Sequence, residues 1–531
     1  MKRWTFLFAL AASLLIGSLP VSAQLASDPN DRMYTDLKLW EDRGLLQNLP
    51  QMRPYPIQLL KKLLSDVQDK GDANDAARAR EYYSQMDEVI DIHPGTGLEM
   101  RTDLKSIYWQ YTFGGPWQGS IDPLVSYSSY LAGVANNGPG DSLLPEYARS
   151  PVDYIYDSAV KPLGNSTFIP RVSSESAASF GSDRFWFQAG DIRGSWGPFW
   201  GENVVLSPSA PQSGQFSAAY RGEKFTALES VMAISAEYSD GTGGPAADKF
   251  LALHGLELYP LPWLTLGIFE SVVWGGRFEM LYLLPYAVHY YTQGFAAFPD
   301  NSFIGINASL KLPQAVRVDF LAYFDDMSFN DIITLKLDTK MKFAAQAGVS
   351  WTPNYPLLTR LSLEAMMVTP YTYSHTNGSG DAVPPTPGAT PNYQDYTNGG
   401  QNMGPSLQPN SLRVEVAALL RPDPVVDVNT FARMILHGNA ASNFSPSYGG
   451  TGTIFDNGEA QNAYSTFRFL NQAVIEKTFQ VGADSSAFFT LPVGKIKVYG
   501  SYTFEYVLDA GLAAGMTALN NYLSAGFFYM Y

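Results

Sequence analysis

A tryptophan-rich run between residues 191 and 201 carries side chains well suited to binding chemistry. The run reads DIRGSWGPFWG, and Ser-Pro and Ala-Pro pairs follow it as far as Pro211. Aromatic rings held beside flexible glycines can stack against the apolar faces of sugar rings. Arg193, Trp196 and Trp200 are therefore candidate binding residues. The alternative is that the two tryptophans belong to an aromatic belt at a membrane interface.

An acidic stretch from Tyr323 to Asp331 offers several oxygen ligands. Its sequence, YFDDMSFND, places aspartate, serine and asparagine side chains directly after an expected strand. Calcium needs about six or more oxygen ligands, and this spacing does not match an EF-hand loop. We expect these side chains to cap and turn the chain instead. No metal or cofactor site is predicted.

The five histidines give little support for catalysis. They are scattered along the chain without H-E-x-x-H or any paired spacing, at His93, His254, His289, His375 and His437. The sequence contains no G-x-S-x-G, and no histidine is followed two residues later by the serine of outer-membrane phospholipases. We therefore predict that the protein is not an enzyme.

The elements that would position the candidate side chains alternate between apolar and polar residues from about residue 99 onward. In one stretch Val414 and Val416 alternate with Arg413 and Glu415. A period of two is typical of a β-strand whose two faces meet different surroundings. A charge that faces lipid at mid-depth costs roughly 2 to 4 kcal/mol, so the charged face must point inward. The pattern predicts an all-β transmembrane barrel with a hydrated or ion-paired lumen.

The last stretch of the sequence alternates in the same way and ends on the aromatic residue Tyr531. Outer-membrane barrels carry aromatic girdles at their rims, so we expect this stretch to be the strand that closes the barrel. About 430 residues, at roughly ten per strand with turns and loops, accommodate roughly 16 to 20 antiparallel strands.

The N-terminal part of the chain differs from the rest. Lys2 and Arg3 precede an apolar run that ends near Ile16, and Val-Ser-Ala before Gln24 matches a signal peptidase site. Residues 1–23 are therefore predicted to be a signal peptide. Residues 24–95 show helical periodicity in three short stretches that are too polar to span a membrane, so we expect a periplasmic helical segment under the barrel. The barrel is assigned to residues 96–531.

The composition agrees with an outer-membrane protein and excludes some partners. Of the 531 residues 14% are aromatic and only 16% are charged, which suits one large barrel. The absence of cysteine excludes a disulfide framework and Cys-ligated metal sites. Loss of Lys2 and Arg3 with the signal peptide changes the net charge from −15 to −17, which makes nucleic acid a poor partner.

Three long polar segments interrupt the strand pattern. They run from 136 to 150, from 374 to 410 and from 438 to 463, and the second of them contains no Lys or Arg. Segments rich in Gly, Pro, Asn and Thr are expected to form outer loops. A weakly charged surface that carries tyrosines suits carbohydrate better than a charged ligand.

Several stretches, taken together and in order, resemble the capsule assembly protein Wzi family of outer-membrane barrels. They are the acidic, Leu-rich run from Arg32 to Leu46, Trp196-Gly197-Pro198 with Val205-Leu206-Ser207, Tyr323 to Met327, and the VTPYTYSH stretch from Val368 to His375. The resemblance touches most of the mature chain. It implies a barrel of about 18 strands with a periplasmic helical segment, and a role in retaining exported polysaccharide at the cell surface.

We therefore predict a non-enzymatic outer-membrane barrel that binds or retains surface (capsular) polysaccharide. The candidate polysaccharide-binding residues are Arg193, Trp196, Trp200, Tyr371 and Tyr373. Expected partners are the polysaccharide, outer-membrane lipid and the barrel-assembly machinery. The alternative is a diffusion porin for small hydrophilic solutes. If the segment from Trp196 to Pro211 folds inward, it favours the binding role, because it then blocks the lumen.

Overall fold

The structure is a computed structural model in which residues 28–531 are described, apart from a set of short ranges. These ranges are 123, 138–139, 150–153, 158–159, 164–165, 239–245, 285–286, 293, 295–299, 327–332, 335–340, 376–390 and 439–468. The predicted signal peptide, residues 1–23, lies outside the described residues. So do the end of the acidic stretch, from residue 327, and the predicted loop residues 439–463.

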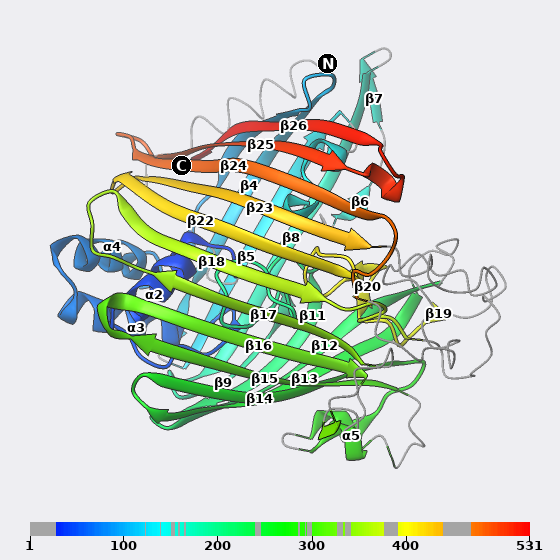
Figure 1. The fold of residues 1–531 in the computed structure, drawn as a ribbon. Coiled ribbons are helices and arrows are strands. Elements are labelled where there is room, and N and C mark those ends of the chain that lie inside the picture. Colours follow the sequence, from blue (N-terminus) through cyan, green and yellow to red (C-terminus); the bar gives the residue numbers. More distant parts are fainter. Residues whose placement is uncertain are drawn as a thin grey trace.

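The described residues form a closed barrel of 18 long antiparallel strands, which confirms the predicted fold class (Figure 1). The strands of the wall are β3 (Gly95–Thr102), β4 (Ile107–Asp122), β5 (Val125–Asn136), β8 (Ser166–Gly181), β9 (Phe185–Ile192), β11 (Ser213–Arg221), β12 (Phe225–Tyr238), β13 (Ala246–Leu261), β14 (Leu264–Gly275), β15 (Asn301–Leu312), β16 (Val316–Asp326), β17 (Lys342–Trp351), β18 (Leu358–Val368), β22 (Ser411–Asp423), β23 (Val426–Gly438), β24 (Ile475–Thr490), β25 (Lys495–Leu508) and β26 (Thr517–Met530). The last strand closes the barrel on the first, with β26 pairing with β3 from Leu523 opposite Thr102 to Met530 opposite Gly95.

Short strands lie at the rims and inside the barrel. They are β1 (Met52–Arg53), β2 (Asp91–Ile92), β6 (Tyr154–Asp157), β7 (Val160–Leu163), β10 (Ser195–Trp196), β19 (Pro391–Asn392), β20 (Thr397–Asn398) and β21 (Gln401–Asn402). Because β10 and β19 to β21 leave the wall, β9 pairs directly with β11 and β18 pairs directly with β22.

The period-two pattern follows the two faces of the wall. In β22 the Val416 side chain is 47% exposed on the outer face, whereas Arg413 is buried and forms an ion pair with Glu202 inside the barrel. Arg433 of β23 and Glu415 of β22 form another ion pair, with nitrogen and oxygen 2.5 Å apart. The charged residues that the sequence placed inward therefore find partners within the barrel.

Among the described residues three helices precede the wall: α2 (Arg32–Asp42), α3 (Ile57–Lys70) and α4 (Ala73–Ser84). Asp31 caps α2 by accepting a hydrogen bond from the Met33 N–H, and Asp72 caps α4 in the same way through Asn74 and Asp75. The later short helices are η1 (Asp141–Leu143), η2 (Glu146–Ala148), η3 (Met280–Leu283), α5 (His289–Thr292), η5 (Pro313–Ala315) and η9 (Ala510–Leu512). No helix of the described residues is long and apolar enough to cross a membrane.

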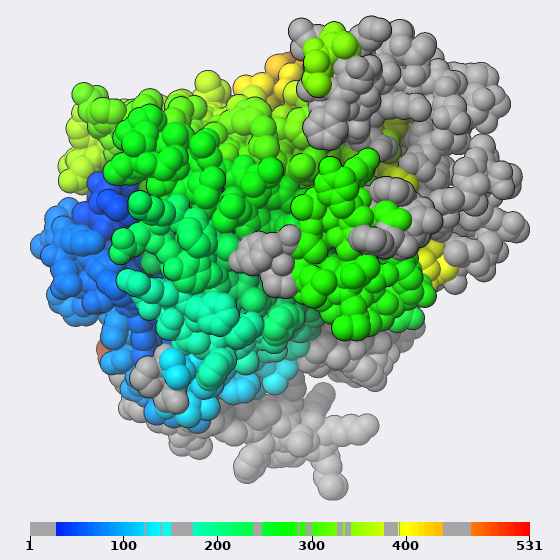
Figure 2. Space-filling model, turned by 90° about the horizontal axis from the view of Figure 1, so that it is seen from below, coloured from blue at the N-terminus to red at the C-terminus, as the bar shows by residue number. Residues whose placement is uncertain are grey.

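The two mouths of the barrel differ in the length of their connections. At the mouth that α2 to α4 cover, residues 222–224 join β11 to β12 and residues 424–425 join β22 to β23. At the opposite mouth, residues 276–300 and 369–410 connect neighbouring wall strands. Outer-membrane barrels have short periplasmic turns and longer outer loops. The helices therefore lie at the periplasmic mouth, where Figure 2 shows them in blue against the ends of the strands.

Candidate functional site

Two outer loops fold into the lumen and form what we call the plug, residues 195–211 and 391–410. Within it the Trp196 N–H donates to the Leu206 carbonyl at 2.9 Å, which closes the first loop on itself. The Ser207 N–H donates to the Met403 carbonyl at 2.9 Å, which joins the two loops. Trp196 and Tyr396 are buried, with 1% and 0% of their surface exposed. The run that the sequence marked for binding is thus inside the barrel.

The periplasmic segment meets the plug inside the barrel. Strand β1 pairs with β10 in a two-stranded antiparallel sheet, with Met52 opposite Trp196 and Arg53 opposite Ser195. The Arg53 guanidinium also donates to the Ser195 hydroxyl at 2.9 Å. Chain that enters from the periplasmic side is therefore hydrogen-bonded to chain that enters from the outer side, and the two together bridge the lumen.

Aromatic rings fill the space between the plug and the wall. Trp196 packs on Phe269 of β14 at 5.7 Å between ring centroids. Tyr373 and Tyr396 stack at 5.6 Å, and their hydroxyls donate to two consecutive carbonyls of the plug, those of Val204 at 2.6 Å and Val205 at 2.9 Å. Buried apolar side chains of the helices, the plug and the wall form one continuous core. A continuous apolar core is the opposite of what a water-filled channel requires.

Two glycines permit the close approach of the plug to its surroundings. A Cβ at Gly255 of β13 would lie 2.6 Å from the Trp196 ring, so the indole rests directly on the backbone of the wall. Gly197 has a φ of +143°, and a Cβ there would lie 2.0 Å from Asn203 Oδ1. Gly197 of the WGPFWG run is therefore needed for the fold of the loop.

Buried polar and charged contacts attach the plug to strands β17 and β22 of the wall. The Glu202 carboxylate pairs with Arg413 of β22 and accepts a hydrogen bond from the Ser406 N–H at 2.7 Å. Gln346 of β17 donates to the Glu202 carbonyl at 2.9 Å. Burial alone would raise the pKa of Glu202, but Arg413 and the hydrogen bonds outweigh it and lower the pKa. The carboxylate is therefore charged when the plug is in place.

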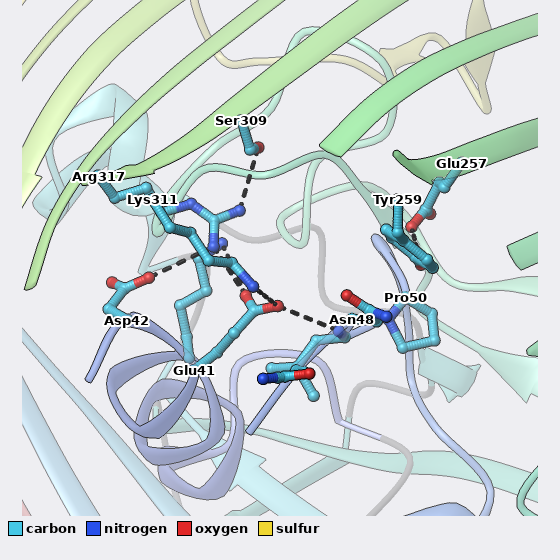
Figure 3. Close-up of polar contacts among 12 residues, drawn as sticks. Glu41, Asp42, Asn48, Pro50, Glu257, Tyr259, Ser309, Lys311 and Arg317 are labelled. Carbon is cyan, nitrogen blue, oxygen red and sulfur yellow. Dashed lines mark hydrogen bonds and ion pairs between the residues drawn. The ribbon is translucent and has the colours of Figure 1, made fainter. Parts of the chain in front are cut away.

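A second group of charges fixes the helices to the periplasmic end of the wall (Figure 3). Glu41 of α2 accepts from Arg317 at 2.7 Å and from Lys311 at 2.9 Å. Arg317 also lies 3.3 Å from Asp42. On the other side of the segment, the Gln51 N–H donates to the Glu257 carboxylate of β13 at 2.9 Å. The helical segment is thus attached to β13, β15 and β16 by buried polar contacts.

The structure brings some of the five candidate residues together and separates others. Trp196 and Tyr373 belong to the same buried core, and Tyr371 is also buried, with 2% of its surface exposed. Trp200 is half-buried beneath the Arg360 guanidinium, which lies 4.2 Å from the ring centroid. Arg193 is half-buried beside Glu175 of β8. A role in binding polysaccharide stays a prediction for all five.

The burial of Trp196 excludes the alternative interpretation that this residue belongs to an interfacial belt. A belt tryptophan faces lipid at the membrane surface, whereas this indole packs against Phe269 on the inner face of the wall. The described part of the long polar loop, residues 391–410, also differs from the prediction of a surface loop. It folds inward because Tyr396 and Met403 complete the core.

Several residues that hold the plug were not among the candidates from the sequence. Glu202, Asn203 and Tyr396 lie in loops, so no strand or helix pattern marks them. The type of Tyr396 was no signal either, because a tyrosine in a polar outer loop is equally expected at a carbohydrate-binding surface. Their partners come from distant strands, and a single sequence does not pair them.

Comparison with known proteins places this fold among outer-membrane barrels. No protein-family model and no curated protein matches the sequence. The structure is similar to that of Wzi, an outer-membrane protein involved in group 1 capsule assembly in Escherichia coli and described as a carbohydrate-binding β-barrel, with a TM-score of 0.58, 13% identity, and coverage of 96% of this chain and 99% of that chain. It also matches Pseudomonas aeruginosa OccD3 (OpdP), with a TM-score of 0.45, 11% identity, and coverage of 84% of this chain and 92% of that chain. The match to Pseudomonas aeruginosa OprD has a TM-score of 0.41, 9% identity, and coverage of 82% of this chain and 95% of that chain.

The predicted resemblance to Wzi is confirmed at the level of the fold. The 18-strand barrel and the outer-membrane barrels that share its fold establish the outer membrane as the location of this chain.

Proposed function

We propose that this protein is a closed, non-enzymatic outer-membrane barrel that binds exported polysaccharide at the cell surface. The observation that carries the proposal is the plugged lumen, in which β1 pairs with β10 and buried apolar side chains pack the helices and the plug against the wall from β9 to β18. A filled lumen has no use in a diffusion channel, but it gives a binding protein rigid outer loops.

The energetics of the plug support closure. Burying one large apolar side chain contributes roughly 1.5 to 3 kcal/mol, and opening a path through the plug would expose several at once. Trp196, Phe303 and Tyr373 are among them, each at most 1% exposed. Opening would also separate Glu202 from Arg413. Thermal motion therefore does not open a stable water path through this barrel.

Carbohydrate is the ligand class that the chain supports best. The Wzi barrel, which shares this fold, is described as carbohydrate-binding, and the outer segments here are weakly charged and bear tyrosines. Of the five candidates, Trp200 and Arg193 are half-buried rather than buried, with Trp200 inside the barrel beneath Arg360 of β18. Trp196, Tyr371 and Tyr373 act indirectly, because their burial fixes the loops that carry the binding surface.

Single-channel conductance of the purified protein in a planar bilayer tests the closed lumen. We expect no large stable steps. Replacing residues 197–205 with a short Gly-Ser linker removes the first loop of the plug and should produce such steps, which makes it the matched control. Large steps from the unaltered protein would support the diffusion porin and overturn the proposal.

Cell-associated polysaccharide tests the binding role separately. Trp200→Ala should reduce retention by roughly 1 to 3 kcal/mol, comparable with the loss of one aromatic anchor from an interface. Assembly should be unchanged, as judged by heat-modifiable gel mobility. If polysaccharide retention is the same in a strain that lacks this protein altogether, the binding role is wrong even if the lumen is closed.

A further inference from the structure

Three ionisable side chains face outward from the wall of the barrel in one row. Glu229 of β12 lies opposite His254 of β13, and His254 lies opposite Glu270 of β14. Along one strand, residues separated by an even number of positions share a face. Leu258, on the same face of β13 as His254, is 41% exposed on the outer wall, and Ile268, on the same face of β14 as Glu270, is 51% exposed. The intervening side chains, such as those of Leu228, Leu253 and Phe269, pack in the core inside the barrel.

An outward charge on a membrane barrel needs a cover or a partner, because lipid solvates it poorly. Here the described residues of the connection between β14 and β15, residues 276–284, 287–292, 294 and 300, fold back over the row, and we call them the outer flap. Figure 1 shows α5 of the flap outside the strand wall beside β14. His289 and Tyr282 of the flap are both 0% exposed. The opposite side of the flap is apolar and exposed, with Phe278, Met280, Leu284, Val288, Tyr290 and Tyr291 between 49% and 73% exposed.

The flap is attached to the wall at defined points. At its base Arg277 pairs with Asp300, which also accepts a hydrogen bond from the Tyr282 hydroxyl at 2.7 Å. The Tyr282 ring packs on Trp274 of β14 at 4.9 Å between centroids. Glu270 accepts a hydrogen bond from the His289 N–H at 2.6 Å. These contacts bring the His289 ring against the His254 ring, with the centroids 4.0 Å apart.

The polar atoms under the flap are arranged as a ligand set. His254 Nε2 lies 2.8 Å from Glu270 Oε1, so in the neutral tautomer that carries its proton on Nε2 this nitrogen donates to Glu270 and Nδ1 offers a lone pair. His254 Nδ1 lies 3.3 Å from Glu229 Oε2. Both ring nitrogens of His289 and both carboxylate oxygens of Glu229 are buried without a hydrogen-bond partner among the described residues. One ligand atom from each of Glu229, His254 and His289 lies within 4.8 Å of the others.

We propose that Glu229, His254 and His289 bind a divalent transition-metal cation of the zinc type and that this cation clamps the outer flap to the wall. Two ligands at about 2.0 to 2.1 Å from a tetrahedral zinc ion are about 3.3 Å apart, which matches the separation of His254 Nδ1 and Glu229 Oε2. Imidazole and carboxylate ligands suit Zn²⁺, and the hydrogen bond from His254 to Glu270 is the partner that a zinc-bound histidine usually has.

A cation accounts for features that an ion pair does not. A Glu–His–Glu row alone leaves the His289 ring unpartnered in a buried, largely apolar site formed with Tyr282 and Trp274. The cation uses the His289 lone pair and offsets the negative charge of Glu229 on a face that meets lipid. No motif in the sequence indicates this site, because its ligands come from two strands and an outer loop and have no motif spacing.

Zinc binding by the purified mature protein in detergent tests the proposal. After treatment with EDTA, the unaltered protein should bind one equivalent of added Zn²⁺ by calorimetry and retain it in elemental analysis. His289→Ala should weaken binding by about 100-fold or more, because a direct ligand is lost. His437→Ala is the matched control, since that histidine is on β23 and contacts Ser411. It should bind zinc like the unaltered protein.

A second readout follows the flap itself. Zn²⁺ should slow tryptic cleavage after Arg277 in the unaltered protein and in His437→Ala, but not in His289→Ala. Heat-modifiable mobility confirms that each variant is folded, and His289→Gln replaces the alanine variant if that one does not assemble. If the unaltered protein binds no stoichiometric zinc, or if the His289 and His437 variants bind it equally, the site does not exist.

Discussion

At the scale of single residues, the plug depends on a few buried charges as well as on its aromatic rings. Glu202 reaches across the lumen to Arg413, and Glu41 reaches from α2 to Arg317. Removing one partner from a buried ion pair leaves a charge without water or a counter-ion, which costs more than the pair contributes. These four residues therefore control how firmly the two ends of the lumen are closed.

Arg413→Leu should destabilise the plug by about 3 to 5 kcal/mol, because it leaves Glu202 buried without its counter-charge. Glu364 also loses a cation 3.7 Å away. The free energy of unfolding in urea, measured in lipid vesicles, reports the loss. The double variant Arg413→Leu/Glu202→Leu is the control and should recover part of it, since no unpaired charge remains at the pair. Additive losses in the double variant would mean that the two side chains are not coupled.

Docking of the helical segment should weaken in acid. Burial would raise the pKa of Glu41, but Lys311, Arg317 and Lys38 outweigh it and hold the pKa well below its usual range. A lowered folded pKa contributes stability above the unfolded value, about 4.3 for Glu, and this contribution is lost as the pH falls below that value. Because the chain has no cysteine, a dye on Ala73→Cys reports undocking by its anisotropy.

The anisotropy should stay constant from pH 7 to about 5 and the segment should become easier to release by urea below about pH 4. Glu41→Gln should weaken docking at neutral pH and remove most of this acid dependence. A urea midpoint that does not change between pH 7 and 3.5 would contradict a charged Glu41 in the docked state.

Residue roles were harder to predict from the sequence than residue types. The WGPFWG run was recognised as unusual, and Trp196 does have a special position, but inside the barrel rather than at a surface. The difference arises because a loop gives no periodic signal for its direction. What decides it is the contact of the indole with Gly255 and Phe269, which lie opposite each other on the neighbouring strands β13 and β14 and are far from the loop in the sequence.

At the scale of elements, alternation along each strand determines which face meets lipid. Val498 of β25 is 42% exposed on the outer wall, and Ser501 faces inward, where its hydroxyl lies 2.7 Å from that of Ser524. The strand pattern was predictable because lipid and lumen impose opposite requirements on neighbouring residues. The short strands β1 and β10 were not, since two residues carry no period.

Val498→Arg should impair assembly, because a cation on the lipid face of the wall is destabilising by an amount that rises to roughly 2 to 4 kcal/mol at the midplane. Ser501→Arg, on the same strand but on the inner face, is the matched control and should assemble far better. Heat-modifiable gel mobility of membrane fractions measures both. Equal assembly of the two variants would show that the assigned faces of β25 are wrong.

At the scale of the whole molecule, one closed wall holds two structures that come from opposite mouths. The helical segment lies at the periplasmic end and the plug lies in the lumen, and side chains of both pack in one core with side chains of the wall. The barrel, the helices that precede it and a strand number between 16 and 20 were predicted from the sequence pattern, and the resemblance to the Wzi family implied about 18 strands. The filled lumen was not predicted, because it is produced by contacts among the helices, the loops and the wall.

Closure of the wall itself depends on the last residues of the chain. Tyr529 of β26 lies opposite Thr96 of β3, and the Tyr531 N–H donates to the Pro94 carbonyl at 2.9 Å. An open strand edge in lipid leaves backbone groups without hydrogen-bond partners, which costs several kcal/mol for each group. Deleting residues 529–531 should therefore prevent closure and leave the chain in the periplasm as a protease substrate.

Quantitative immunoblots of outer-membrane fractions measure this outcome. Tyr531→Ala is the control, because it keeps the backbone hydrogen bond to Pro94 and removes only the ring. It should assemble better than the truncated chain if backbone closure is the main requirement. Should the alanine variant fail as completely as the truncation, the aromatic ring at the rim rather than the β26–β3 pairing would be what assembly requires. Normal levels of the truncated protein would refute the closing role of these residues.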